Sequence, residues 1–378
     1  MTKKGKYQKV PEKKVLGWKK ILLIVLAVIV VLVAAAATIG WNYFKDLVGY
    51  VREATYQENE LSDEELEELL GGTIGYDPEY DEEAFWATAP ADTDYTKMGK
   101  IINIMLVGQS YRPGEETKLS DTMILCTLNR ETNTFTMTSF LRDLYVQLPN
   151  YKGRICGMQR MNVCYNLGWV WAGELGGMEM LDLLMYNNFG VDVDYNIEIN
   201  FEDVIKIVDL LGGITIELNE DEAAYMTEYP QCEGSFEAGE NLLAGDAALV
   251  YARMRKSNAA DNDFNRTARQ RNMITQIIKK CMTMNLAELN GILKQVLPMI
   301  LTDMSQEEIL EMTKIALTML PNLKIESAQC PAPDTYWGDI VQIGGYDAGV
   351  IRCDIAKNKE ILMALAEADV LEEMAETE

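Results

Sequence analysis

An uncharged apolar run over residues 21–41 is the feature that most constrains how this 378-residue chain can fold. At about 1.5 Å of rise per residue, a helix of that length spans roughly 30 Å, the thickness of a membrane's hydrocarbon core. A buried core helix is one alternative, but a globular interior seldom needs a helix that is apolar on every face. A cleaved signal peptide is the other, although its apolar core is usually shorter. We therefore predict a transmembrane helix over 21–41.

The charge distribution predicts the orientation of this helix. Residues 1–20 hold eight lysines, and because positive flanks stay inside, this lysine-rich tail is expected in the cytoplasm. Residues 1–44 have a net charge of +7 while the whole chain has −25, so the remainder carries −32. We expect that remainder to lie outside the cell, held to the cell membrane by a single pass. Because this domain is strongly acidic, its overall electrostatic field repels nucleic acid. Binding of any anionic ligand would require a local basic cluster.

Cysteine and histidine usage excludes several kinds of site. The chain has seven cysteines with no Cys-x-x-Cys pair, and it has no histidine. Histidine-dependent catalytic triads are therefore excluded, and the usual Cys/His zinc sites are disfavoured. Some cysteines could pair outside the cell, but an odd number leaves at least one free, and buried thiols are an equally good alternative.

The pattern along the chain predicts a layered α/β domain. Residues 45–96 are rich in Asp and Glu and predict a polar stalk with a short helix, for which Ser62 is the candidate N-cap. From Lys100 onward, apolar or alternating runs predict strands at 101–107, 122–128, 134–140, 195–199, 214–218 and 323–330. Helical patterns lie at 177–188, 201–211, 245–251, 263–285 and roughly 286–319, followed by an acidic helical tail. Strands interleaved with helices predict an α/β sandwich over 97–378.

A cluster of arginines is the first candidate site. Five of the twelve arginines in the chain fall within residues 253–271. Arg266 and Arg269 would be neighbours on a helix, with Gln270 beside them, and Arg253 and Arg255 would share a face of an extended segment. Guanidinium groups bind phosphate oxygens in pairs and stay charged at physiological pH, so the cluster suits a phosphate ligand. A solvated helix face with salt bridges is the alternative.

Polar residues at the ends of three successive predicted strands form a second candidate group. They lie in the segments 108–112, 120–122 and 139–143. Strand ends are where α/β folds hold ligands. Asp121 and Asp143 could bind a divalent cation and Arg142 could face an anion. Alternatively, Asp143 pairs with Arg142 or caps a turn.

Together these segments resemble the LytR-CpsA-Psr family from about residue 100 to residue 272. The resemblance covers seven segments in the order of that family: 103–108, 120–125, 142–149, Arg160 with Asn162, 208–213, 245–255, and 263–266 with Arg269 and Gln270. It implies a three-layer α/β/α sandwich with a central mixed sheet, a hydrophobic pocket for a polyprenyl chain, and an arginine-lined mouth for its pyrophosphate.

The resemblance also implies an activity and its residues. It points to a membrane-anchored phosphotransferase that uses Mg²⁺ (or Mn²⁺) to attach a polyprenyl-pyrophosphate-linked glycopolymer, such as teichoic acid or capsule, to peptidoglycan in a Gram-positive-type envelope. The implied catalytic residues are Arg142, Asp143, Arg253 and Arg255, and the implied metal ligand is Asp121. The implied pyrophosphate-binding residues are Arg112, Lys118, Arg142, Arg160, Arg253, Arg255, Arg266, Arg269 and Gln270.

Two positions depart from the family's pattern. Ser110 stands where the family usually has an aspartate that binds the metal, and Leu119 stands where it usually has an arginine. Magnesium needs few protein ligands, so Asp121 with phosphate oxygens could suffice, and Lys118 or Arg112 could supply the missing charge. Two alternatives therefore stay open: a module that binds polyprenyl pyrophosphate without turnover, and a pyrophosphatase of the same fold.

Overall fold

The computed structural model describes residues 41–57, 62–70, 75–76, 98–109, 120–150, 153–232, 234–255, 262–319 and 322–367. Apart from Trp41, the segment predicted to cross the membrane lies outside the described residues, as do Ser110, Arg112, Lys118 and Leu119. Among the helices that are described, none combines the length and the apolar character needed to cross a bilayer.

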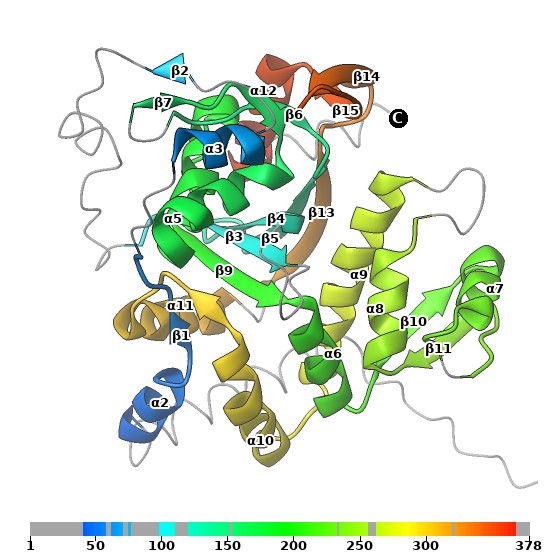
Figure 1. Cartoon of the computed structure of the whole chain (residues 1–378). Coiled ribbons are helices and arrows are strands. Elements are labelled where there is room, and N and C mark those ends of the chain that lie inside the picture. The colour runs from blue at the N-terminus through cyan, green and yellow to red at the C-terminus, as the bar shows by residue number, and fades with distance from the viewer. Residues whose placement is uncertain are drawn as a thin grey trace, which may run out of the picture.

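A seven-stranded mixed sheet forms the centre of the molecule (Figure 1). In spatial order its strands are β1 (Arg52–Glu53), β12 (Leu301–Thr302), β9 (Tyr195–Asn200), β3 (Ile101–Gln109), β4 (Ser120–Asn129), β5 (Thr134–Phe140) and β13 (Lys324–Cys330). The strands β3, β4 and β5 pair antiparallel in sequence order, while β9 and β13 join them in parallel. The three consecutive strands predicted from the apolar and alternating runs are therefore confirmed.

Alternate residues of the central strands face two different helical layers. Met105 and Leu125 pack on one side with α5 and α12, whereas Ile104 and Ile124 pack on the other with α11 and part of α9. This alternation is the period-2 pattern of a sheet that is covered on both faces. The helices are α5 (Asn162–Phe189), α6 (Phe201–Leu210), α8 (Gly245–Arg253), α9 (Asp263–Cys281), α10 (Leu286–Val296), α11 (Gln306–Met319) and α12 (Ile355–Glu367). The predicted sandwich with a mixed sheet and flanking helices is confirmed.

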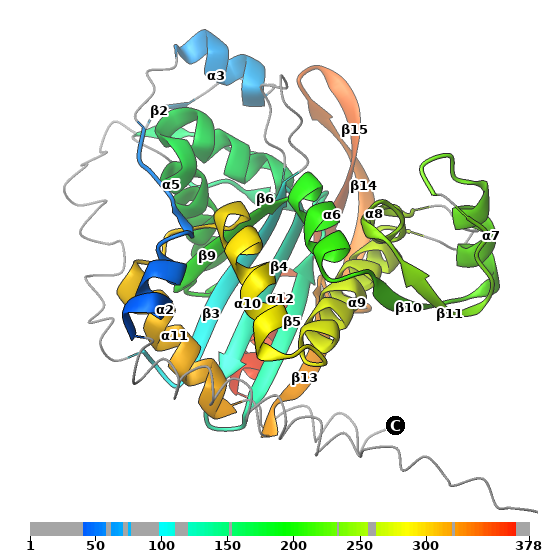
Figure 2. The ribbon, with the colours of Figure 1, turned by 90° about the horizontal axis from the view of Figure 1, so that it is seen from below.

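A smaller lobe beside the sheet has its own core. It contains α7 (Glu220–Glu228) and a ribbon of β10 (Ile214–Leu218) with β11 (Gly239–Leu243). The lobe projects from the ends of α6 and α8 (Figures 1 and 2). The strand predicted at 214–218 exists, but it pairs with β11 rather than with the central sheet. The short elements elsewhere are β2 (Gly75–Tyr76) with β7 (Arg154–Ile155), β6 (Tyr145–Gln147) with β8 (Met158–Arg160), and η3 (Leu297–Met299).

The N-terminal part of the predicted stalk belongs to the folded domain. Within 45–57, the side chains of Leu47, Val48 and Ala54 are buried, and β1 forms the parallel edge strand beside β12. The acidic composition predicted a polar stalk, but these few apolar residues pack on the sheet because burial removes them from water. The short helix expected after Ser62 is confirmed as α3 (Asp63–Leu70). Residues 77–97 of the stalk lie outside the described part.

Three other elements differ from the sequence predictions. The helix expected at 177–188 is the second arm of α5, which starts at Asn162 and kinks at Gly173, where φ is +73° and favours glycine. Its first arm is buried on nearly all sides, so it shows no amphipathic pattern. The helical stretch 286–319 is interrupted by β12, and a hairpin of β14 (Tyr336–Ile343) and β15 (Tyr346–Cys353) was not predicted.

Two partly buried aspartates share one amide where α5 meets the sheet. Nδ2 of Asn196 donates to Oδ2 of Asp182 and to Oδ2 of Asp303, each at 2.9 Å. Burial raises the pKa of Asp182 well above its usual range, and the neighbouring Asp303 raises it further. Burial likewise raises the pKa of Asp303. Folding therefore shifts both carboxyl groups toward their protonated form relative to the unfolded chain.

This pair predicts a specific dependence of stability on pH. Because the folded-state pKa exceeds the unfolded value of about 3.9, the pair stabilises the fold below that pH, and the stabilisation is lost as the pH rises through the folded-state pKa. The Asp182→Asn variant should therefore gain free energy of unfolding relative to the native protein as the pH rises above about 4. Urea unfolding across this range measures the difference. Asp192→Asn, at an exposed site, is the control, and a pH-independent difference for Asp182→Asn would contradict the prediction.

Candidate anion-binding site

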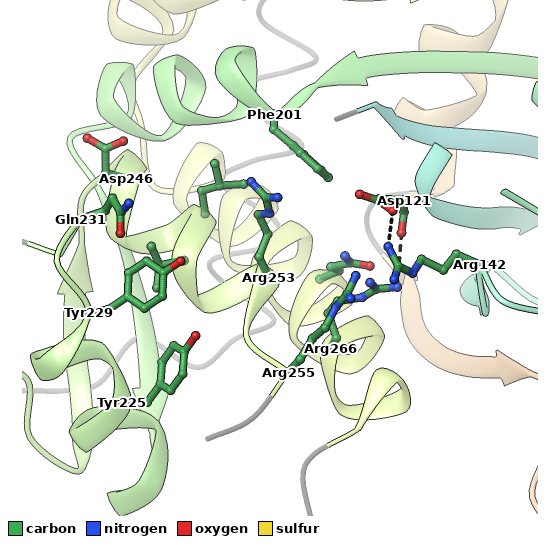
Figure 3. A pocket seen from close by; sticks show the side chains of 13 residues that line it. Asp121, Arg142, Phe201, Tyr225, Tyr229, Gln231, Asp246, Arg253, Arg255 and Arg266 are labelled. Atoms are coloured by element: carbon green, nitrogen blue, oxygen red, sulfur yellow. Dashed lines mark hydrogen bonds and ion pairs between the residues drawn. The ribbon is translucent and has the colours of Figure 1, made fainter. Parts of the chain in front are cut away.

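Four arginines converge on one cavity between the sheet and the smaller lobe. The cavity has a volume of about 520 Å³. Its lining residues are Asp121, Arg142, Phe201, Tyr225, Tyr229, Gln231, Asp246, Leu249, Val250, Arg253, Arg255, Arg266 and Gln270. Figure 3 shows a basic end, where Arg142, Arg255 and Arg266 gather near Asp121, and an aromatic end around Tyr225 and Tyr229.

The pairing of β4 with β5 brings Asp121 and Arg142 together. Met123 lies opposite Phe140, so continuing this antiparallel register sets Asp121 opposite Arg142. Nη1 of Arg142 donates to Oδ1 of Asp121 at 2.6 Å. Partial burial lowers the pKa of Arg142, but Asp121 and other nearby carboxylates outweigh this and raise it overall. Arg142, just after the end of β5, is therefore permanently charged.

Close packing of α6 and α8 positions Arg253. A Cβ on Gly245 would lie 2.3 Å from the carbonyl oxygen of Ile205, so glycine lets the two helices approach. The guanidinium of Arg253, at the end of α8, then lies 5.3 Å from the ring centroid of Phe201, at the start of α6. This cation–π contact holds Arg253 over the cavity without neutralising its charge.

The first turn of α9 supplies the most buried cation of the cavity. Oδ1 of Asn262 caps the helix by accepting from the amides of Phe264 and Asn265. Nη2 of Arg266 then lies 2.8 Å from Oδ2 of Asp263, whose Oδ1 lies 3.8 Å from Nε of Arg255. Burial lowers the pKa of Arg266 to about 10, and the other arginines contribute, so it is still charged at neutral pH.

The basic end has unused capacity to bind an anion. Among the described residues, the four guanidinium groups of the cavity have ion-pair contacts with three carboxylates, those of Asp121, Asp143 and Asp263. Nε of Arg266 and Oε1 of Gln270 are buried and have no hydrogen-bond partner among the described residues. Since a buried donor without a partner costs about 1–3 kcal/mol, an anion that accepts from it would be bound favourably.

Six of the residues predicted for the site line the cavity: Asp121, Arg142, Arg253, Arg255, Arg266 and Gln270. Asp143 and Arg160 lie behind it. Oδ2 of Asp143 is 3.4 Å from Nε of Arg142, and its Oδ1 is 3.7 Å from Nε of Arg160. Nη2 of Arg160 donates to the carbonyl of Gly349 at 2.7 Å. These two residues therefore support Arg142 from the far side rather than face the cavity.

Arg269 points away from the cavity, which disagrees with its predicted role in binding pyrophosphate. Its Nε donates to Oε1 of Glu222 at 2.7 Å, and its Nη1 donates to the carbonyl of Met254 at 2.9 Å. Arg269 is a neighbour of Arg266 on α9, but its ion pair with Glu222 holds its guanidinium against α7 instead. Its position favours a structural role that ties α7 to the end of α8.

The aromatic end contains residues that the sequence did not single out. Tyr225 and Tyr229 on α7 and just after it have stacked rings with centroids 5.4 Å apart. Gln231 and Asp246 add polar groups beside them. The four-residue spacing of the tyrosines was visible in the sequence, but only the placement of the smaller lobe brings them opposite the arginines.

A divalent cation would find few protein ligands here. Among the described residues, no three Asp, Glu, Cys or His side chains are grouped closely enough to hold a metal. Of the two carboxylates that line the cavity, Asp121 is at the basic end and Asp246 lies at the opposite end (Figure 3). Magnesium is commonly held by one or two carboxylates together with phosphate oxygens and waters. Asp121 fits that arrangement when a phosphate ligand is bound.

The fold and the site define a class: an α/β sandwich protein with an arginine-lined pocket that suits an anion. The model of the LytR_cpsA_psr family matches residues 79–350, and this chain therefore belongs to the LytR-CpsA-Psr family. This result confirms the family resemblance seen in the sequence.

Curated relatives and solved structures agree with this assignment. The polyisoprenyl-teichoic acid–peptidoglycan teichoic acid transferase TagU of Bacillus cereus is 30% identical over 253 residues, which are 65% of this chain and 76% of the relative. Biofilm regulatory protein A of Streptococcus mutans is 32% identical over 193 residues, 49% of this chain, and the match spans only 45% of that relative. The structure of TagT bound to LIIa-WTA has the same fold, with a TM-score of 0.54 and 21% identity over 74% of this chain and 93% of TagT. TagT has also been solved with bound octaprenyl pyrophosphate lipid, with a TM-score of 0.50 and 20% identity over 72% of this chain and 92% of that one.

Proposed function

We propose that this protein is a transferase that binds a polyprenyl-pyrophosphate-linked glycopolymer in the basic pocket and attaches the polymer to peptidoglycan. The observation that carries the proposal is the convergence of Arg142, Arg253, Arg255 and Arg266 on one cavity of a strongly acidic chain. The family includes proteins named as teichoic acid transferases, which supports a transferase activity.

The proposed reaction is a phosphoryl transfer. A sugar hydroxyl of peptidoglycan attacks the phosphorus atom that bears the glycopolymer, and a new P–O bond forms. The bond from that phosphorus to the bridging oxygen breaks, and polyprenyl phosphate leaves with the electron pair. The hydroxyl proton passes to a base or to solvent, and the product is a phosphodiester. Negative charge on the phosphate oxygens is what such a reaction must stabilise, and fixed cations do so without reorganising.

The lining of the cavity suits the rest of the donor. Phe201, Leu249 and Val250 give it apolar surface next to the arginines, as the lipid end of the donor requires. The tyrosines at the aromatic end offer flat faces with hydroxyl groups, which suit an amphipathic ligand. Together they support a donor with a charged centre and a less polar flank.

We further propose that Asp121 holds Mg²⁺ together with phosphate oxygens, which would add positive charge at the pyrophosphate. The Asp121→Asn variant should then need at least about tenfold more Mg²⁺ for half-maximal activity, because losing even an indirect partner of a bound metal has effects of that size. Titration of transfer activity with Mg²⁺ measures this. Asp246→Asn, at the opposite end of the same cavity, is the control, and an unchanged Mg²⁺ requirement in Asp121→Asn would argue against this ligand.

The membrane anchor at 21–41, with the acidic domain outside the cell in a Gram-positive-type envelope, is also part of the proposal. The eight lysines before the apolar run and the acidic remainder after it support this orientation. A lipid-linked donor is confined to the membrane, so an anchor would keep the pocket close to its substrate.

The direct test is transfer of a labelled polyprenyl-pyrophosphate glycan to peptidoglycan oligomers by the full chain, with and without Mg²⁺. A linked product supports the proposal and excludes the binding module. Tight donor binding without product from a folded protein would favour the binding module, and Ser110→Asp with Leu119→Arg should then create activity. Release of glycan phosphate into water without linkage would identify a pyrophosphatase.

A further inference from the structure

The β14–β15 hairpin exposes an unusual amount of large apolar surface. Tyr336 is 38% exposed, Trp337 52%, Ile340 70% and Tyr346 80%. The hairpin projects from the body of the molecule beyond its helices (Figure 2). Exposed apolar side chains gathered in one place usually mark a site of interaction. None of the residues assigned to the basic pocket lies on this hairpin.

The strand register separates these side chains into two faces. Tyr336 pairs with Cys353 and Ile340 pairs with Gly349, so Tyr336, Gly338, Ile340 and Gly349 share one face, called here the docking face. Trp337 and Tyr346 are on the other. A Cβ placed on Gly338 or Gly349 would meet nothing within 4 Å. The docking face is therefore open above Gly338 and Gly349, while Ile351 and Cys353, which pair with Gly338 and Tyr336, pack against the main core and anchor the hairpin.

The docking face is continuous with the rim of the basic pocket. The ring of Tyr336 lies 4.6 Å from that of Phe264, which sits between Asp263 and Arg266 in the first turn of α9. On the neighbouring strand, the carbonyl of Gly349 accepts from Arg160, whose guanidinium is next to Asp143. The amide of Ile351 donates to the carbonyl of Asp143 at 2.9 Å. A ligand bound along this face could thus extend to the region of Arg142 and its neighbours.

We propose that the docking face binds sugar rings of the acceptor glycan strand. This inference deepens the proposed transferase function and rests on it. Sugar rings have flat, weakly polar faces that pack on aromatic and aliphatic side chains, and hydroxyl edges that need hydrogen-bond partners. Tyr336 and Ile340 provide the apolar contacts, and Gln342 with Asp347, hydrogen-bonded to each other further along the same face, provide polar groups.

The charges of the hairpin favour an uncharged glycan over a membrane surface. The docking face carries no Lys or Arg, and Asp347, further along the same face, adds a negative charge. The one arginine of the hairpin, Arg352, is on the other face, where its Nε is 2.6 Å from Oδ2 of Asp339 and its guanidinium lies over Tyr145. Binding to anionic lipid relies on clusters of Lys and Arg, which this hairpin lacks.

The open space above Gly338 provides a test that leaves the fold intact. Gly338 does not have a positive φ, and its Cβ direction is open, so a Gly338→Leu variant should fold normally while its side chain fills the docking face. We expect it to raise the KM for peptidoglycan oligomers about five- to tenfold, the effect of losing one or two aromatic or aliphatic contacts. The Kd for polyprenyl pyrophosphate should not change. Tyr346→Ser, on the opposite face of the same hairpin, is the matched control and should leave both values unchanged.

A binding measurement separates this inference from the transferase proposal. Calorimetry with the full chain and an uncharged oligomer of N-acetylglucosamine, which has the sugar rings of a glycan strand without the lactyl carboxylate of MurNAc, needs no turnover, so it reports on the docking face even if transfer fails. Binding that is weakened in Gly338→Leu but not in Tyr346→Ser supports the inference. Equal affinity in the native chain and Gly338→Leu would overturn it. Quenching by brominated lipids in vesicles that is stronger for Ile340→Trp, which places a reporter on the docking face, than for the native chain would identify a membrane surface as the occupant and would overturn it too.

Discussion

Replacing Arg253 and Arg255 together by alanine is expected to lower the transfer rate by at least about 10³-fold, because the loss of a single fixed donor to developing charge costs about 10²–10³. Both guanidinium groups line the cavity: Arg253 lies over Phe201, and the ion pair that Arg255 makes within the described part of the chain is a distant one, 3.8 Å from Asp263. Their removal leaves Arg142 and Arg266, each paired with a carboxylate, to hold the pyrophosphate.

The control for this pair is Lys279→Ala with Lys280→Ala. It also removes two positive charges, but from the last turn of α9, away from the cavity-lining residues. The net charge of the chain then changes equally in both double variants, so only the local field at the pocket differs. Circular dichroism and the unfolding midpoint establish that both variants are folded. Transfer that survives in Arg253→Ala/Arg255→Ala would refute the assignment of the pocket.

Arg269→Ala is expected to reduce the free energy of unfolding by about 3–5 kcal/mol, the typical cost of leaving a buried charge without its partner. Glu222 uses both carboxylate oxygens: Oε1 accepts from Arg269, and Oε2 accepts from the amide of Asn219 to complete the capping box of α7. Without Arg269 the buried carboxylate of Glu222 has no cation beside it, and the carbonyl of Met254 loses a donor. Urea unfolding measures the change.

A second variant separates structure from ligand binding at this position. Glu222→Gln with Arg269→Met removes both charges while keeping the side-chain lengths and an oxygen for the α7 cap. Its stability should lie closer to that of the native protein than that of Arg269→Ala, since no buried charge is left unpaired. It should also still bind polyprenyl pyrophosphate. A normally stable Arg269→Ala that no longer binds this lipid would instead restore the pyrophosphate role first predicted for Arg269.

Local patterns predicted those parts of the fold that depend on sequence neighbours. The strands β3 to β5 follow one another along the chain and pair in that order, so their periodicity alone located them. The β14–β15 hairpin also carried a local signal, because Gly344 and Gly345, both with positive φ, form the two-residue turn between its strands. The first arm of α5 carried none, since it is buried on nearly all sides and lacks a polar face.

The candidate site was predictable where it rests on strand ends and on one helix turn. The cluster of arginines and the register of β4 with β5 account for Arg142, Arg253, Arg255, Arg266 and Asp121. The tyrosines could not be assigned in this way, because their position depends on how the smaller lobe packs beside α8. The orientation of Arg269 depends on its tertiary partner Glu222, which lies 47 residues earlier in the chain.

Asp121 and Asp263 act as resident counter-ions of the basic pocket. Each is held against a guanidinium at 2.6–2.8 Å before any ligand arrives. The arginine side chains are thus already ordered, so an incoming ligand need not lose the entropy of fixing them. It must instead compete with two tethered carboxylates, whose effective concentration is high. A small singly charged ion such as chloride competes poorly with these carboxylates for the arginines. A pyrophosphate competes better, because it can bind several guanidinium groups at once. The carboxylates therefore filter the anions that can occupy the pocket.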